Sequence, residues 1–263
     1  MCVCVKTSRK PSLKDWLWLL LVCWHTTEAK DLLVIAGWDK PPYVISHQDS
    51  GYEVDLVRQV LATANHRISM LHVPYGRTYE TMKQENADIA LTLNAKSGVP
   101  PEILSQPYIT YQNVAISLKK NNIKLNKLSD FRLFSVIAFQ SASKVLGNDF
   151  ASAVKENLLY IELPEQRRQV EMLLVGSVDV VVMDVNIFNY YSRVIKGENQ
   201  MDDVNVYALF PPTHYSAAIS DPELRATFDR AMANFKLSEQ YRQLRQQYNI
   251  IYPVEFSMVN LDK

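Results

Sequence analysis

Short apolar runs that alternate with helical segments are the feature that most constrains the fold of this chain. Runs rich in Val, Ile and Leu occur at 32–36, 68–73 and 89–93, and the segments between them carry apolar residues at helical spacing. Alternation of strand and helix predicts a parallel sheet with crossover connections. Because the pattern begins again after Lys119, the sequence predicts an α/β fold of two doubly wound lobes.

The second half of the chain repeats the alternation. We expect strands at 134–139, 158–163 and 180–183, and helices at 145–157, 164–175 and 187–195. Pro164 suits the first turn of its helix, where the missing N–H is not needed. The chain then returns through 204–210 and ends in amphipathic helices at 222–235 and 239–248. This pattern predicts that Ile35 and Val181 lie in the cores of different lobes.

The first 29 residues have the features of a signal peptide. Four basic residues precede an uncharged run at 16–24, and Thr27-Glu28-Ala29 follows as a cleavage site. A bilayer crossing needs about twenty apolar residues, so this run is too short for a helix that spans the membrane. We expect a mature protein that begins near Lys30 and is soluble in the periplasm. A permanent anchor and a lipoprotein attached through Cys23 are the alternatives.

Composition excludes several classes of function. Cys2, Cys4 and Cys23 all precede the expected cleavage site, so the mature chain has no disulfide and no cysteine for a structural zinc site. The formal net charge of the whole chain is zero, which gives no reason to expect a nucleic-acid partner. We therefore expect no metal or other cofactor. We also expect a monomer.

Three acidic phrases and one Pro-Tyr step occur in a characteristic order. They are Gly51-Tyr52-Glu53-Val54-Asp55-Leu56, Asn86-Ala87-Asp88-Ile89-Ala90, Ser105-Gln106-Pro107-Tyr108, and Gly176-Ser177-Val178-Asp179 leading to Asp184. In order and spacing these phrases resemble the family 3 extracellular solute-binding proteins. Proteins of that family are two-lobed receptors that deliver amino acids and related small polar molecules to ABC importers. The resemblance covers nearly the whole chain after residue 30.

The resemblance implies a type II periplasmic-binding-protein fold. Lobe 1 would comprise residues 30–113 and 212–263, lobe 2 would comprise residues 114–211, and crossings near 113–118 and 208–212 would form the hinge. Open α/β sheets bind ligands at the carboxyl ends of their strands, and closure of the hinge buries a small ligand between two such edges. The implied ligand is small and polar, amino-acid-like or an amine. The implied partner is an ABC-transporter permease or, alternatively, a membrane sensor.

The resemblance also suggests ligand-binding residues in lobe 1. Trp38 and Tyr43 belong to a Pro-Pro-aromatic loop after the first strand and are candidates to stack on the ligand. Asn94 and Lys96 follow the third strand, where the family supplies polar contacts. Arg77 matches the aromatic-x-Arg entry of one subgroup. The alternatives are that Trp38 and Tyr43 only cover the lobe surface and that Arg77 is a solvated helix residue.

In lobe 2 the candidates are Ser141, Ser143 and Asp184. Ser141 and Ser143 precede a helix and resemble the Gly-Thr-Thr anion loop of the family, although Ser143 could equally be an N-cap. Asp184 aligns with the carboxylate that receives a ligand ammonium group, with capping of the next helix as its alternative. For Asp55 and Asp88 we expect structural roles, because both lie where a carboxylate satisfies backbone N–H groups.

One departure from the family pattern concerns the ligand. The family usually carries a Thr-x-x-Arg phrase whose Arg holds the ligand carboxylate, but the segment after Asn94 has no Arg, and Lys96 is the only cation there. Ordinary α-amino acids should therefore bind weakly unless Lys96 compensates. Catalysis is a weaker alternative: Ser141-x-x-Lys144 matches a penicillin-binding phrase, but its Ser-Asp-Asn and Lys-Thr-Gly partners are absent.

Overall fold

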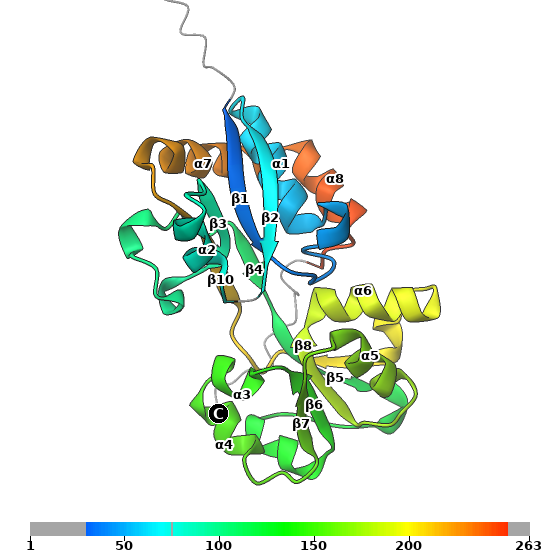
Figure 1. Cartoon of the computed structure of the whole chain (residues 1–263). Helices are drawn as coiled ribbons and strands as arrows, with labels where there is room; N and C mark the ends of the chain where they lie inside the picture. Colours follow the sequence, from blue (N-terminus) through cyan, green and yellow to red (C-terminus); the bar gives the residue numbers. More distant parts are fainter. Residues whose placement is uncertain (1–29, 75, 252–263) are drawn as a thin grey trace, which may run out of the picture.

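A computed structural model describes residues 30–74 and 76–251 of the chain. The expected signal peptide and Tyr75 lie outside the described residues. Within these residues, no helix is both long and apolar enough to cross a bilayer. Figure 1 shows two lobes, one above the other, joined by the connections between β4 and β5 and between β9 and β10. We define lobe 1 as residues 30–111 and 213–251, and lobe 2 as residues 113–207.

Lobe 1 is built on a five-stranded sheet. In the order of the sheet, its strands are β2 (Arg67–Val73), β1 (Asp31–Gly37), β3 (Ile89–Leu93), β10 (Thr213–Ile219) and β4 (Ile109–Tyr111). β1 pairs in parallel with β2 and β3, whereas β10 is antiparallel to β3 and β4. The helices are α1 (Tyr52–Thr63), which packs against α7 (Pro222–Phe235) and α8 (Glu239–Gln247), and α2 (Thr78–Gln84), which contacts β1 and β3.

Lobe 2 repeats this plan. In sheet order its strands are β7 (Tyr160–Leu163), β6 (Val136–Phe139), β8 (Val180–Asp184), β5 (Asn113–Leu118) and β9 (Val204–Tyr207). β6 is parallel to β7 and β8, and β5 is antiparallel to β8 and β9. The helices of this lobe are α3 (Ala142–Val145), α4 (Asn148–Val154), α5 (Gln166–Leu174) and α6 (Val185–Lys196).

The prediction of two α/β lobes is confirmed. Ile35 is buried in β1 of the first sheet and Val181 is buried in β8 of the second sheet. Every residue of β8 is buried, and the apolar run Val180–Met183 predicts this for a central strand. Burial of such strands is the main source of stability for residues 30–251, which contain no cysteine.

Three features differ from the sequence-based expectation. The helix expected at 145–157 is divided into α3 and α4 at Gly147, whose φ of +97° no α-helix can contain. β10 was not expected, and each sheet contains one strand antiparallel to its neighbours. The segment expected to form the first crossing is β5 of the second sheet, so that crossing is at Gln112.

Gln112 connects the two crossings by hydrogen bonds beside the second sheet. Its side-chain Nε2 donates to the carbonyl oxygens of Asn113 and Phe210, both at 2.9 Å, and Phe210 belongs to the return crossing. Its backbone N–H donates to Asp184 Oδ2 at 2.8 Å. The hinge therefore lies in direct contact with the end of β8.

Candidate functional site

Polar residues follow the carboxyl ends of strands in both lobes, next to the hinge. Trp38 follows β1 and Asn94 follows β3, while Ser141 follows β6 and Asp184 ends β8. In α/β sheets this edge is where ligands bind, because strand ends and helix starts leave backbone groups available there. The candidate site is therefore the region where these two edges face one another.

Asp184 and Tyr43 meet across the two lobes. The Tyr43 hydroxyl donates to Asp184 Oδ1 at 3.0 Å and accepts a bond from Asn186 Nδ2 at 2.8 Å. Asp184 is also the N-cap of α6, since Oδ1 accepts the N–H groups of Asn186 at 2.9 Å and Ile187 at 3.2 Å. Gln112 donates to Oδ2. The donors named here are thus three backbone groups of lobe 2 and the hinge, together with the Tyr43 hydroxyl of lobe 1.

Burial strongly affects the charges at this contact. Only 3 % of Asp184 is exposed, and burial raises its pKa to about 6 although the hydrogen bonds from Gln112, Ile187, Tyr43 and Asn186 act in the opposite direction. Burial also lowers the pKa of Lys40, against the attraction of Glu53 and Asp184. The Lys40 ammonium lies 4.4 Å from the ring centroid of Tyr111. Lys40 is thus a cation close to two carboxylates, a role that the sequence did not indicate.

Glu53 is the second buried carboxylate at the hinge side of lobe 1. It is 0 % exposed and accepts hydrogen bonds from Thr92 Oγ1 at 2.6 Å, from the Tyr111 hydroxyl at 3.1 Å and from the Tyr108 hydroxyl. Burial raises the pKa of both tyrosines, so their hydroxyls remain donors at neutral pH. Tyr43 stacks on Tyr111 with 4.1 Å between ring centroids. Glu53 thereby fixes the aromatic surface that carries the Tyr43 hydroxyl.

The loop at Ser141 and Ser143 holds a carboxylate of the protein itself. Glu162 Oε2 accepts the N–H of Ser141 at 2.7 Å, and Oε1 accepts the N–H of Ser143 at 2.8 Å and the Tyr160 hydroxyl at 2.8 Å. Burial would raise the pKa of Glu162, but the bonds from Ser143, Tyr160 and Ser141 outweigh it and lower the pKa. The two N–H groups that would receive a ligand anion are already satisfied.

The remaining candidates lie toward solvent on lobe 1. Trp38 is 59 % exposed and its Nε1 donates to the carbonyl oxygen of His72 at 3.3 Å. Asn94 Oδ1 accepts the backbone N–H of Lys96 at 2.9 Å, and Lys96 itself is exposed. Arg77 is exposed at the start of α2. The structure thus brings Tyr43 and Asp184 into contact and leaves these four side chains outside that contact.

Nearly all of the described part of the chain matches a known family. Residues 32–250 match the model of the bacterial extracellular solute-binding proteins, family 3. The chain belongs to this family. No curated protein sequence matches it. The ordered phrases from Gly51 to Asp184 therefore indicated the family correctly.

Several solved structures share the fold of this family 3 solute-binding protein. The ligand-binding core of GluR0 in complex with L-glutamate has a TM-score of 0.64 at 16% identity, over 84% of this chain and 99% of that one. A histidine kinase sensor domain similar to periplasmic binding proteins has a TM-score of 0.62 at 16% identity, over 84% and 97%. A substrate-binding protein of an ABC uptake transporter from Streptococcus pneumoniae, with bound histidine, has a TM-score of 0.61 at 13% identity, over 83% and 92%.

Two acidic residues of the family phrases bond inside lobe 1. Asp88 accepts the N–H of Leu33 at 2.9 Å and the ammonium of Lys30 at 2.7 Å. Asp55 accepts the Tyr248 hydroxyl at 2.5 Å and pairs with Arg58, so its partners are side chains instead of the expected backbone groups. Among residues 30–74 and 76–251, no three acidic, His or Cys side chains lie close enough together to hold a metal ion.

Proposed function

We propose that this family 3 protein captures a small ligand bearing a cationic amine between its lobes and delivers it, in the periplasm, to an ABC importer. The observation that carries the proposal is the Tyr43–Asp184 contact, in which a buried carboxylate receives the Tyr43 hydroxyl from the opposite lobe. The proposal requires reversible binding and includes no catalytic step.

The proposed binding step exchanges one donor for another. When the lobes separate, the backbone donors of lobe 2 and the hinge stay with Asp184, and the Tyr43 hydroxyl leaves with lobe 1. A ligand ammonium group then takes the free position and adds the attraction of opposite charges to the hydrogen bond, which the neutral Tyr43 hydroxyl cannot supply. Glu53 and Asp184 are two carboxylates beside one ammonium, that of Lys40, and this formal excess of negative charge favours a second cation.

The proposed ligand does not depend on a carboxylate. Glu162 already satisfies the N–H groups of Ser141 and Ser143, and the segment after Asn94 carries Lys96 where the family usually has Arg. A ligand carboxylate would have to displace a carboxylate that is tethered to the same lobe. We therefore expect amines without a carboxylate to bind more tightly than ordinary α-amino acids, with Trp38 contributing at the rim of the cleft.

A thermal-shift screen of amines, amino acids and small acids, followed by calorimetry, tests the proposal. Asp184→Asn keeps an N-cap residue and removes the charge, so an amine that binds the unaltered protein should bind this variant at least about a hundredfold more weakly. Asp203→Asn, on an exposed turn of lobe 2, is the matched control. Full affinity in Asp184→Asn would remove the proposed role of this carboxylate.

A second calorimetric comparison addresses Lys96. If a common α-amino acid binds tightly to the unaltered protein, Lys96→Ala should weaken that binding, because Lys96 is then the cation that holds the ligand carboxylate. If the amino acid still binds tightly to Lys96→Ala, the expectation drawn from the missing Arg is wrong.

Signal reception is the second candidate function. It is favoured by the similarity to the histidine kinase sensor domain, whose TM-score is close to that of the transporter protein. Both roles use the same lobe closure, and only the partner of the closed form differs. Neighbouring genes discriminate between them: a permease and an ATPase support transport, whereas a kinase or cyclase supports signalling.

A further inference from the structure

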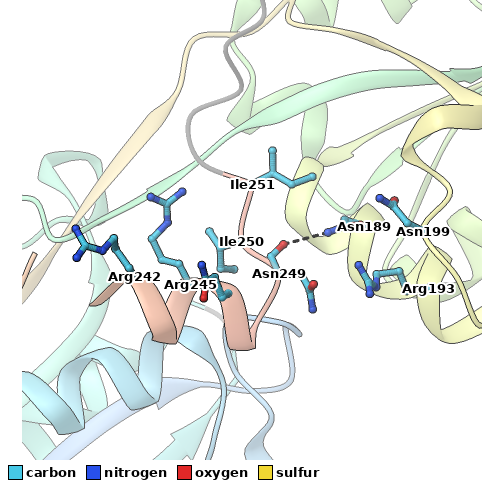
Figure 2. Close-up of a pocket in the computed structure, with 9 residues that line it drawn as sticks. Asn189, Arg193, Asn199, Arg242, Arg245, Asn249, Ile250 and Ile251 are labelled. Carbon is cyan, nitrogen blue, oxygen red and sulfur yellow. Dashed lines mark hydrogen bonds between the residues drawn. The ribbon is translucent and has the colours of Figure 1, made fainter. Parts of the chain in front are cut away.

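A hollow lies between the lobes, along the later turns of α6 and the end of α8 (Figure 2). Its volume is about 540 Å³, which is within the range of small-molecule sites. Nine residues line it, and none of the residues proposed for the cleft is among them. The hollow is therefore separate from the proposed cleft, and residues of both lobes line it.

The lining of this hollow carries one sign of charge. It has three arginines, four amide side chains and two isoleucines, and no carboxylate. Arg193 extends from α6 of lobe 2, whereas Arg242 and Arg245 extend from α8 of lobe 1 (Figure 2). Arg242 pairs with Glu239, but no ion pair of Arg193 occurs within the part of the chain that the structure describes. Guanidinium groups on opposite walls suit an anion with at least two carboxylate or phosphate groups.

Asn189 adds a second requirement. Only 4 % of this residue is exposed, and its Nδ2 donates to the carbonyl oxygen of Asn249 at 3.0 Å, which fixes the direction of the amide. Its Oδ1 has no hydrogen-bond donor among residues 30–74 and 76–251. A buried acceptor without a donor is unfavourable, so a ligand that supplies an O–H or N–H here is favoured.

We infer that this hollow is a binding site for a small di- or tricarboxylate that also carries a hydroxyl group. Its carboxylates bridge Arg193 of lobe 2 and Arg242 or Arg245 of lobe 1, and its hydroxyl donates to Asn189 Oδ1. This inference does not depend on the ligand proposed for the cleft.

Such a ligand stabilises the lobe arrangement of this structure. Asn186, Asn189 and Arg193 lie on one face of α6, at i, i+3 and i+7. Asn186 accepts the N–H of Ile251 at 2.7 Å and Asn189 donates to Asn249, so this face already contacts the last described residues of lobe 1. An anion one turn further along the same face extends this row of contacts between lobes.

Calorimetry with citrate and tricarballylate, which differ only in the hydroxyl group, tests the inference on the full mature chain. We expect citrate to bind at least about tenfold more tightly than tricarballylate, and Arg193→Gln and Arg242→Gln each to weaken citrate by at least about tenfold. Arg168→Gln, an exposed arginine of α5, is the matched control and should leave citrate binding unchanged.

Three results would overturn the inference. The first is that citrate does not bind. The second is that Arg168→Gln weakens citrate binding as much as Arg193→Gln does, which would indicate a general effect of charge. The third is that citrate binds only to the Glu255→Gln variant, in which a residue that follows Ile251 in the sequence is changed. That result would indicate that the arginines pair with a carboxylate of the chain itself. Circular dichroism and thermal unfolding of each variant establish that a lost signal reflects lost binding and not lost folding.

Discussion

Protonation of one buried carboxyl group, that of Asp184, affects the unfolding free energy of the whole protein. Burial raises its pKa from 3.8 to about 6, so the folded state holds this proton more tightly than the unfolded state does. A group of this kind contributes most stability below pH 4 and loses that contribution as the pH rises through 6. The full difference is about 3 kcal/mol, because each pKa unit corresponds to about 1.4 kcal/mol.

We therefore predict that the unaltered protein gains about 1.4 kcal/mol of unfolding free energy relative to Asp184→Asn when the pH falls from 8 to 5. Urea unfolding of both proteins at both pH values measures this difference. Because the other titrating groups are the same in both proteins, their effects cancel in the comparison. Asp203→Asn should differ from the unaltered protein by the same amount at both pH values. A pH-independent difference for Asp184→Asn would contradict the prediction.

Glu162 gives a second prediction for a single residue. Glu162→Ala leaves the N–H groups of Ser141 and Ser143 without their carboxylate, and we expect a loss of about 1–3 kcal/mol. Added formate should raise the melting temperature of this variant by restoring an anion to the two N–H groups. The exposed Glu156→Ala variant is the control and should not respond. An equal effect of formate on all three proteins would show that the loop does not select an anion.

The sequence identified some of these residues as candidates and missed others. Asp184 and Tyr43 could be chosen because each belongs to a phrase with a fixed place after a strand. Glu162 and Lys40 could not, because their roles depend on partners that only the folded chain brings near: Ser141 lies on a neighbouring strand end, and Asp184 lies in the other lobe. A buried charge network has no local sequence pattern.

At the scale of one element, the start of α1 depends on close packing against the Tyr43 loop. Gly51 has φ of +117°, and a Cβ there would lie 2.3 Å from the carbonyl oxygen of Tyr43. We predict that Gly51→Ala costs about 1–3 kcal/mol more than Gly176→Ala. Gly176 also has positive φ, but an added methyl group there would meet no atom within 4 Å, so its cost is only the conformational one of about 1 kcal/mol. Equal urea midpoints for the two variants would contradict this.

Element type was predictable wherever apolar periodicity was strong. The strand at 89–93 and the helix at 222–235 were expected with the bounds that the structure has. The division between α3 and α4 was missed, since one glycine with positive φ interrupts an otherwise helical pattern. β10 was missed because Thr213-His214-Tyr215 gives no apolar run, and its place in the sheet depends on pairing with distant β3 and β4.

At the scale of the whole molecule, we predict that the exported protein begins near Lys30. A basic start followed by a short uncharged run favours cleavage after Ala29 over retention in the membrane. N-terminal sequencing and intact-mass measurement of protein from the periplasm test this. An intact Met1, or the added mass of a lipid on Cys23, would contradict it.

The central position of β10 determines the order in which the lobes can fold. β10 lies between β3 and β4 but is synthesised roughly a hundred residues after β4. Until it arrives, β3 and β4 have unpaired edges that favour association with other chains. All strands of lobe 2 lie between Asn113 and Tyr207, so lobe 2 completes its sheet first. The lobe that begins the chain is therefore the last to fold, and its unfinished sheet is the stage most exposed to aggregation.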